Sequence, residues 1–322
     1  MKKSTKISII IASVLVAVGA TIFCTAMAKS NWDFTTLSLV EYETNTYYAD
    51  SEFKNISIDS ELDAITFVKS DSEECKIVCH EMDTLRHFAK VENETLKIGT
   101  IDKRKWYEYI GGINVGSPKV TVYLPANEYN SLDIECTTGL VKLPKDFTFE
   151  NANINVTTGA VKIMTPQADN MKIKSTTGSI TISDLIVNSL RLDVTTGNIN
   201  VKNVNCTADL KTSTTTGDVA LENVKCENVV LDATTGDVSL ENVIAASKFR
   251  IETDTGDINI RNSDANDIHI ETDTGDVTGS LLSDKIFFAE TDTGDIDVPR
   301  TTSGGRCEIE TDTGDIEINI KK

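Results

Sequence analysis

Apolar and polar residues alternate with a period of two along most of the chain. In the stretch ETDTGDINI, residues 252–260, Ile258 and Ile260 are separated by polar residues, and Ile251 precedes them. The apolar positions are mostly β-branched and the short runs end at Gly or Asn, which is typical of half-buried strands. After residue 28 no window shows a convincing apolar stripe of helical period. The pattern therefore predicts an all-β protein.

A Thr-Gly pair recurs ten times at a spacing of 19 or 20 residues, which is the signature of a repeat architecture. Apolar residues stand two after each glycine, and mostly also five before and four after it, so each unit reads as strand, Thr-Gly corner, strand and looser return. The glycines are Gly139, Gly159, Gly178, Gly197, Gly217, Gly236, Gly256, Gly275, Gly294 and Gly314.

An antiparallel meander and a parallel β-helix could both bury these apolar columns. The nearly constant length favours the parallel β-helix, in which each unit stacks on its predecessor about 4.8 Å away. Thr precedes every glycine, and Asn recurs six residues after four consecutive ones, where stacked side chains can hydrogen-bond at a bend (Asn203, Asn223, Asn242 and Asn262). The glycine itself is expected to supply a positive φ or a bulge. We therefore predict a β-solenoid of about ten coils.

Seven cysteines occur without any CxxC pair. Cys206 and Cys226 both lie nine residues after a corner glycine in adjacent units, which puts them within reach of a disulfide without ideal direction. Cys75, Cys79, Cys136 and Cys307 fit small buried apolar side chains.

The first 28 residues resemble a membrane anchor or a signal segment. No charged residue interrupts positions 7–28, a run long enough to span a bilayer, and Lys2, Lys3 and Lys6 would remain cytoplasmic. Ala26-Met27-Ala28 fits a cleavage site, so a secreted protein is the alternative. The apolar run is long for a signal peptide, which favours a single-pass membrane protein with its repeats outside the cytoplasm.

The remaining sequence divides into three parts. Residues 29–49 are expected to be a polar tether, residues 50–130 degenerate coils that cap the open N-terminal end, and residues 131–322 the solenoid repeats. Trp106, Tyr107 and Tyr109 interrupt the pattern of the second part, and we expect them to belong to the cap, with an aromatic ligand groove as the alternative.

The composition excludes some function classes. A net charge of −19 and a pI near 4.6 argue against nucleic acid as a partner. His80, His87 and His269 show no metal-ligand spacing with Cys or another His, and neither a phosphate loop nor a GxSxG elbow occurs. Parallel β-helices can cleave polysaccharides with clustered acids, but catalysis needs one asymmetric site, and the acids here are equivalent from coil to coil. We predict no enzyme.

Acidic residues gather in the last four units, four before, two before and one after the glycine. By strand alternation the first two columns face solvent. Carboxylates about 5 Å apart repel by somewhat under 1 kcal/mol per pair in water. Two interpretations stay open: a solvated surface of turn residues, or a strip that binds Ca²⁺ between coils as the chain's only cofactor. We call this set the acidic strip: Glu252, Asp254, Asp257, Glu271, Asp273, Asp276, Glu290, Asp292, Asp295, Glu310, Asp312 and Asp315.

The units TTGDV and TDTGDI resemble the bacterial putative-adhesin family, also called domain of unknown function 4097. In four consecutive units an Asn stands six residues after the glycine, which is part of this resemblance. The resemblance covers roughly residues 50–320. It implies an exported, coil-like β domain that binds at the cell surface, and it brings no catalytic residues.

Three functions follow, in order of preference. The first is a membrane-anchored, non-catalytic surface domain that binds cell-wall, protein or cell-surface partners. The second is an envelope sensor or scaffold that regulates a membrane partner. The third is a polysaccharide lyase or hydrolase.

Overall fold

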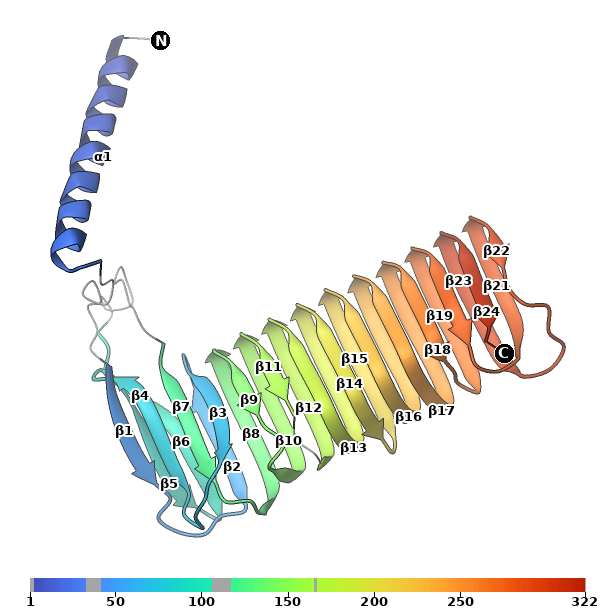
Figure 1. Ribbon diagram of the computed structural model, residues 1–322, viewed down its shortest axis with the longest axis horizontal. Helices are drawn as coiled ribbons and strands as arrows, with labels where there is room; N and C mark the ends of the chain where they lie inside the picture. Colours follow the sequence, from blue (N-terminus) through green and yellow to red (C-terminus); the bar gives the residue numbers. More distant parts are fainter. Residues whose placement is uncertain (1–2, 33–41, 106–116, 165–166, 322) are drawn as a thin grey trace.

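The computed structural model describes residues 3–32, 42–105, 117–164 and 167–321. One helix, α1 (Lys3–Lys29), precedes the strands and is apolar enough to cross a membrane, with a mean hydropathy of 2.6 over its most apolar window. All other regular elements in the described ranges are strands (Figure 1). The predicted all-β solenoid with an apolar N-terminal helix is confirmed.

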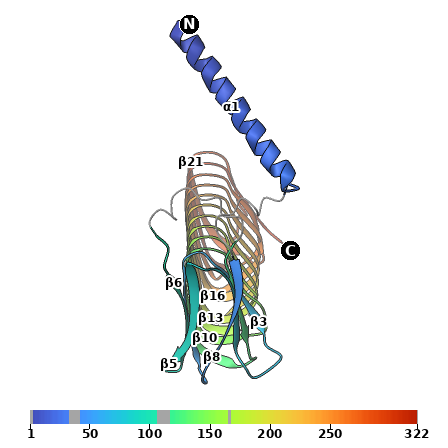
Figure 2. The same cartoon turned by 90° about the vertical axis from the view of Figure 1, so that its left-hand side faces the viewer.

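The coils stack in parallel, and Figure 2 shows them one behind another as flattened loops. Each coil contributes one segment to each of two long sheets. The segments before the Thr-Gly corners form the first sheet, in this order: β5 (Leu85–Glu92), β6 (Thr95–Asp102), β2 (Asn55–Ser60), β8 (Glu128–Thr138), β10 (Thr148–Thr158), β12 (Gln167–Thr177), the second half of β13 (Ile180–Thr196), β15 (Asp209–Thr216), the second halves of β16 (Val219–Thr235) and β17 (Val238–Thr255), β19 (Asp267–Thr274), β23 (Gly305–Thr313) and β21 (Lys285–Thr293).

The segments after the corners form the second sheet. Its order is β1 (Tyr42–Tyr48), β4 (Lys76–Met82), β7 (Lys119–Leu124), β3 (Ala64–Lys69), β9 (Val141–Leu143), β11 (Val161–Ile163), the first half of β13, β14 (Ile199–Cys206), the first halves of β16 and β17, β18 (Ile258–Ser263), β20 (Val277–Leu281), β24 (Ile316–Ile320) and β22 (Ile296–Asp297).

The core lies between the two sheets and consists of the apolar columns read from the sequence. Ile154 pairs with Ile134 on one side and with Ile173 on the other, so like positions meet from coil to coil. These side chains are at most 1% exposed. A parallel sheet buried on one face needs this alternation, because adjacent residues point to opposite faces.

The Thr-Gly corners follow from backbone crowding. Gly236 has φ 143°, and a Cβ there would lie 2.2 Å from the carbonyl oxygen of Gly217 in the preceding coil. Only glycine fits such an approach, and the predicted positive φ is confirmed at every corner glycine except the first, Gly139. The opposite bend uses the predicted Asn column, whose members have φ between 50° and 54°.

The last two coils stack in exchanged order. The chain forms β21 and β22 as the outermost coil and then returns, so that β23 pairs with both β19 and β21. Our expectation that every unit stacks on its predecessor is wrong here. A buried ion pair between Lys285 Nζ in β21 and Asp264 Oδ1, 2.5 Å apart, ties the outermost coil to a coil beyond the inserted one.

At the N-terminal end each sheet continues with one parallel strand, β6 or β7, and then with antiparallel strands. β6 adds to β2 and carries β5, while β7 adds to β3 and carries β4 and then β1. We call β1, β4, β5, β6 and β7 the end layer. It covers the edge of the first coil, formed by β2 and β3.

Candidate functional site

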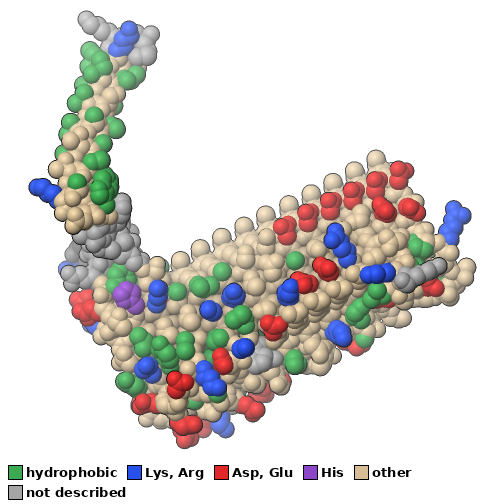
Figure 3. All heavy atoms as spheres, viewed as in Figure 1, with side chains coloured by type: hydrophobic (Ala, Val, Ile, Leu, Met, Phe, Trp, Pro, Cys, Tyr) green, Lys and Arg blue, Asp and Glu red, His purple; other side chains and the backbone are tan. Residues whose placement is uncertain are grey.

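The acidic strip is one continuous surface at the C-terminal end, seen as red side chains along one edge in Figure 3. Glu252 pairs with Glu271, Glu271 with Glu310, and Glu310 with Glu290. The sheet therefore brings together all four predicted rungs, with the last two exchanged. Ligand atoms of Glu252, His269 and Glu271 lie within 4.8 Å of one another, which is close enough for one cation, and calcium binding by the strip stays a hypothesis.

The Asp column directly after the glycines has a structural role that sequence reasoning missed. Asp257 Oδ1 accepts a hydrogen bond from the backbone N–H of Asp276 at 2.9 Å, and Asp276 Oδ1 accepts one from Asp315 at 2.8 Å. The same bond recurs from Asn198 through Asp218 and Asp237 to Asp295. One oxygen of each of these carboxylates is thus used to hold adjacent corners together, except at the outermost coil, where Asp295 only donates through its backbone N–H.

The two solvent-facing columns differ in whether basic side chains lie beside their carboxylates. Glu252 contacts Arg250, and His269 Nε2 lies 3.4 Å from Glu271 Oε2 and 3.8 Å from Glu252 Oε1. Within the described part of the chain, the carboxylates of the other column make no hydrogen bond or ion pair (Asp254, Asp273, Asp292 and Asp312). This column is the free part of the acidic strip.

A second surface feature is a groove of about 740 Å³ that runs along the coils beside the Asn column. Asn223 Nδ2 donates to Asn203 Oδ1 at 3.0 Å, and Asn242 Nδ2 donates to Asn223 Oδ1 at 3.1 Å. The predicted Asn stack is confirmed across these coils. We call the feature the Asn groove; it is lined by Asp184, Leu185, Ile186, Asn203, Val204, Asn205, Asn223, Lys225, Asn242, Ile244, Asn262, Leu282 and Lys321.

The left-handed backbone of the Asn column creates the Asn groove. A residue in this conformation bends the strand, so the columns on its two sides diverge. One wall is the stacked column Ile186, Asn205, Lys225 and Ile244. Ile186 is 54% exposed, which is unusual for a large apolar side chain in this solenoid.

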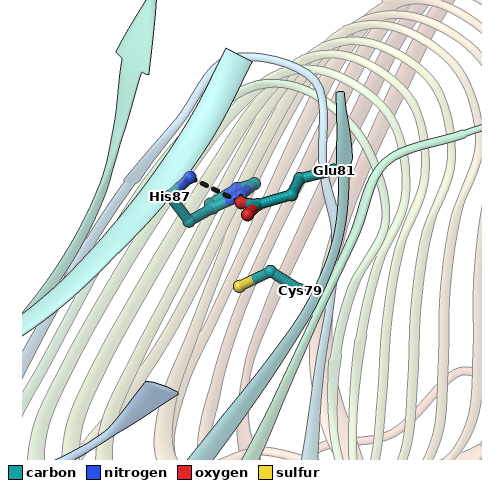
Figure 4. Close-up of side chains that lie close together, drawn as sticks. All are labelled: Cys79, Glu81 and His87. Atoms are coloured by element: carbon teal, nitrogen blue, oxygen red, sulfur yellow. Dashed lines mark hydrogen bonds and ion pairs between the residues drawn. The ribbon is translucent and has the colours of Figure 1, made fainter. Parts of the chain in front are cut away.

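A third group is buried in the end layer, where Cys79 and Glu81 of β4 face His87 of β5 (Figure 4). His87 Nδ1 lies 2.7 Å from Glu81 Oε2, and His87 Nε2 lies 2.9 Å from Asp63 Oδ2. Asp63 stands in the turn between β2 and β3, at the corner of the first coil. We call these four residues the buried cluster.

Burial and hydrogen bonding act in opposite directions on the buried cluster. Burial alone would lower the pKa of His87, but the hydrogen bonds to Asp63 and Cys79 and the charges of these two groups together outweigh burial and raise the pKa to about 10. Burial would raise the pKa of Glu81, and hydrogen bonds from the His87 backbone and from Asn45 bring it below its ordinary value. Burial raises the pKa of the Cys79 thiol.

Sequence reasoning missed the buried cluster because its members lie on different strands. The turn from β4 to β5 brings His87 back against Cys79 and Glu81. The spacing of these residues in the sequence does not match a known metal-binding motif. The alternation of β4 in CKIVCHE could have shown that Cys79 and Glu81 point to one side. His269, set aside for the same reason, reaches the acidic strip through sheet pairing.

Two other predicted features have simple outcomes. Cys206 and Cys226 are free, buried thiols. Trp106, Tyr107 and Tyr109 lie outside the described residues, so the hypothesis of an aromatic groove there stays untested.

The fold and these surfaces define a class: a parallel β-solenoid behind an apolar helix that fits a membrane anchor or signal sequence. The chain belongs to the Toastrack DUF4097 family, which matches residues 53–215 and again 206–322. The resemblance drawn from the TTGDV and TDTGDI units is thereby confirmed. Among curated proteins no relative was found.

Several solved structures are similar to this chain. A putative adhesin from Parabacteroides distasonis has 9% identity and a TM-score of 0.44, over 88% of this chain and 98% of its own. A putative lipid binding protein from the same species has 13% identity and a TM-score of 0.43 over the same shares. A putative adhesin from Bacteroides fragilis has 16% identity and a TM-score of 0.36, over 87% and 97%.

Proposed function

We propose that the protein is a membrane-anchored, non-catalytic surface domain that binds an extended polysaccharide of the cell envelope or of another cell in the Asn groove. The single observation that carries this proposal is the direction of the Asn groove. It follows the stacking axis, so a linear polymer lying in it meets a similar set of groups at every coil.

The chemistry of the Asn groove suits sugar hydroxyls. An Asn amide has two donors and an acceptor oxygen with two lone pairs, and the stack between coils uses only part of this capacity. Exposed Ile186 and Leu282 offer apolar surface to the carbon faces of a sugar ring. Lys225 and Lys321 favour a polymer that carries some negative charge.

The topology that we propose places this surface outside the cytoplasm. Lys2, Lys3 and Lys6 precede the apolar stretch of α1, and positive residues stay on the cytoplasmic side. A non-catalytic role is supported by the repetition itself, because equivalent groups on equivalent coils give no asymmetric pair for acid and base chemistry.

The test uses full-length protein in detergent micelles and co-sedimentation with insoluble cell-wall polysaccharide. Ile186→Ser removes an exposed apolar contact, which we expect to weaken binding about five-fold. The matched control is Ile101→Ser, at a residue 47% exposed on β6 of the end layer. Equal binding by both variants and by the unmodified protein would contradict the assignment to the Asn groove. Binding to a wall-associated protein and not to the glycan would contradict the proposal that the partner is a polysaccharide.

A further inference from the structure

The buried cluster contains three different kinds of metal ligand on two facing strands. The Cys79 sulfur, a Glu81 carboxylate oxygen and a His87 ring nitrogen all lie within 4.8 Å of one another. Cys79 and Glu81 are 0% exposed and His87 is 4% exposed. A thiolate, an imidazole and a carboxylate are the ligand types that Zn²⁺ takes in proteins.

The residues around these three groups are arranged as outer partners of a metal site. Asp63 Oδ2 accepts a hydrogen bond from His87 Nε2, which would leave Nδ1 to face the metal, and Ser60 Oγ in turn donates to Asp63 Oδ2 at 2.6 Å. Glu81 Oε1 accepts from Asn45 Nδ2 at 2.7 Å and from Tyr47 at 2.9 Å, so Oε2 is oriented toward His87. Metal-binding His and carboxylate residues are commonly oriented in this way.

One buried atom in the cluster has no partner. Asp63 Oδ1 is fully buried and makes no hydrogen bond to any described residue. An unsatisfied buried carboxylate oxygen is costly, and nearby positive charge is what compensates it. This observation is independent of the ligand spacing: the His87 ring faces Oδ2 of this carboxylate, and Oδ1 is the oxygen that further positive charge in the end layer would compensate.

We propose that Cys79, Glu81 and His87 bind a structural Zn²⁺ ion, with Asp63 as the outer carboxylate that orients His87. On binding, the Cys79 thiol proton and the Nδ1 proton of the protonated His87 ring leave to solvent, and His87 becomes neutral with Nε2–H on Asp63. Three protein ligands leave a fourth position for water. The 2.7 Å contact between Nδ1 and Glu81 Oε2 opens slightly to admit the ion.

The position of the site explains what the metal does. β4 and β5 add to different sheets of the solenoid through β7 and β6. A metal that joins Cys79 and Glu81 on β4 to His87 on β5 therefore clamps the two sheets together at the open end of the stack. Because the ligands are buried, the ion enters as the end layer folds and leaves only when it opens.

The experiment measures metal in full-length protein purified in detergent after growth in zinc-supplemented or cobalt-supplemented medium. We expect about one zinc per chain by elemental analysis, and in the cobalt form a thiolate-to-cobalt charge-transfer band in the near ultraviolet. EDTA should lower the melting temperature, because the chelator removes the ion once the end layer opens.

Matched variants locate the site. Cys79→Ser should lose the charge-transfer band and the effect of EDTA, whereas Cys206→Ser, another buried thiol outside the cluster, should keep both. His87→Gln should reduce the metal content while it keeps a hydrogen-bonding group in place. Folded, unmodified protein without zinc, without the cobalt band and without a response to EDTA would overturn the proposal, as would a band that survives in Cys79→Ser.

Discussion

At the scale of single residues, two positions decide how the chain turns. The corner glycine lets one coil lie directly on the carbonyl of the previous one, as Gly236 does on Gly217. The Asn column solves the opposite bend differently, because Asn tolerates a left-handed backbone and also bonds to its neighbour. Both positions recur in the sequence for physical reasons, which is why they could be predicted.

Gly236→Ala should destabilise the coils on both sides of the substitution. The new Cβ overlaps the Gly217 carbonyl oxygen and the backbone has φ 143°, so we expect a loss of about 3 kcal/mol or more. Hydrogen exchange of amides in the two coils measures this opening locally. Thr235→Ala, at an exposed neighbour, serves as the control, and equal exchange in the two variants would contradict the prediction.

Replacing Asn223 separates backbone conformation from side-chain bonding. Asn223→Ala and Asn223→Gly both lose the bonds to Asn203 and Asn242, but only Gly accepts φ 54° without strain. We therefore expect the alanine variant to be less stable than the glycine variant by about 1 kcal/mol. Denaturant-induced unfolding gives the difference, and a glycine variant as unstable as the alanine variant would show that backbone strain is unimportant here.

At the scale of elements, the exchanged order of the last two coils is the main departure from the sequence prediction. The repeats around Gly275, Gly294 and Gly314 share the same motif, so each could pair with any other. The loop from β22 to β23 and the buried pair of Lys285 with Asp264 select one order. Periodicity predicts that units stack but not which neighbour each one takes.

Engineered cysteine pairs test this order directly. In a parallel sheet, paired residues of adjacent strands lie about 4.8 Å apart, within the Cα distance of a disulfide. Glu271→Cys with Glu310→Cys should cross-link, because these positions pair in β19 and β23, whereas Glu271→Cys with Glu290→Cys should not. Mass spectrometry of non-reduced digests identifies the bond. The reverse result would mean that the coils follow sequence order.

At the scale of the whole molecule, the sequence was sufficient for the repeat architecture and insufficient for the sites. The repeats predicted the core columns, the corner glycines and the acidic strip, because every coil has the same strands and bends and therefore needs similar residues at the same positions. The buried cluster of Asp63, Cys79, Glu81 and His87 arises from antiparallel pairing in the end layer, where nothing repeats. The Asn groove arises from how stacked bends diverge, which a single unit cannot show.

The uneven charge of the molecule gives the last prediction, which concerns the calcium hypothesis for the acidic strip. From residue 250 onward the chain has 18 Asp or Glu and 7 Lys or Arg. Neighbouring carboxylates in the free column repel, so changing its four members to Asn should stabilise the protein by about 2 kcal/mol at low salt, and added salt should remove the difference. The variant combines Asp254→Asn, Asp273→Asn, Asp292→Asn and Asp312→Asn.

Calcium separates the two interpretations of this strip. If the free column only faces water, millimolar calcium should stabilise the unmodified protein no more than magnesium does at equal ionic strength. If the strip binds Ca²⁺ between coils, calcium should raise the melting temperature of the unmodified protein selectively, and the four-Asn variant should lose that response. Asp71→Asn, at an exposed aspartate between β3 and β4, is the control. A selective calcium response that persists in the four-Asn variant would place the ion away from this column, because its carboxylates are the only ligands that the substitutions remove.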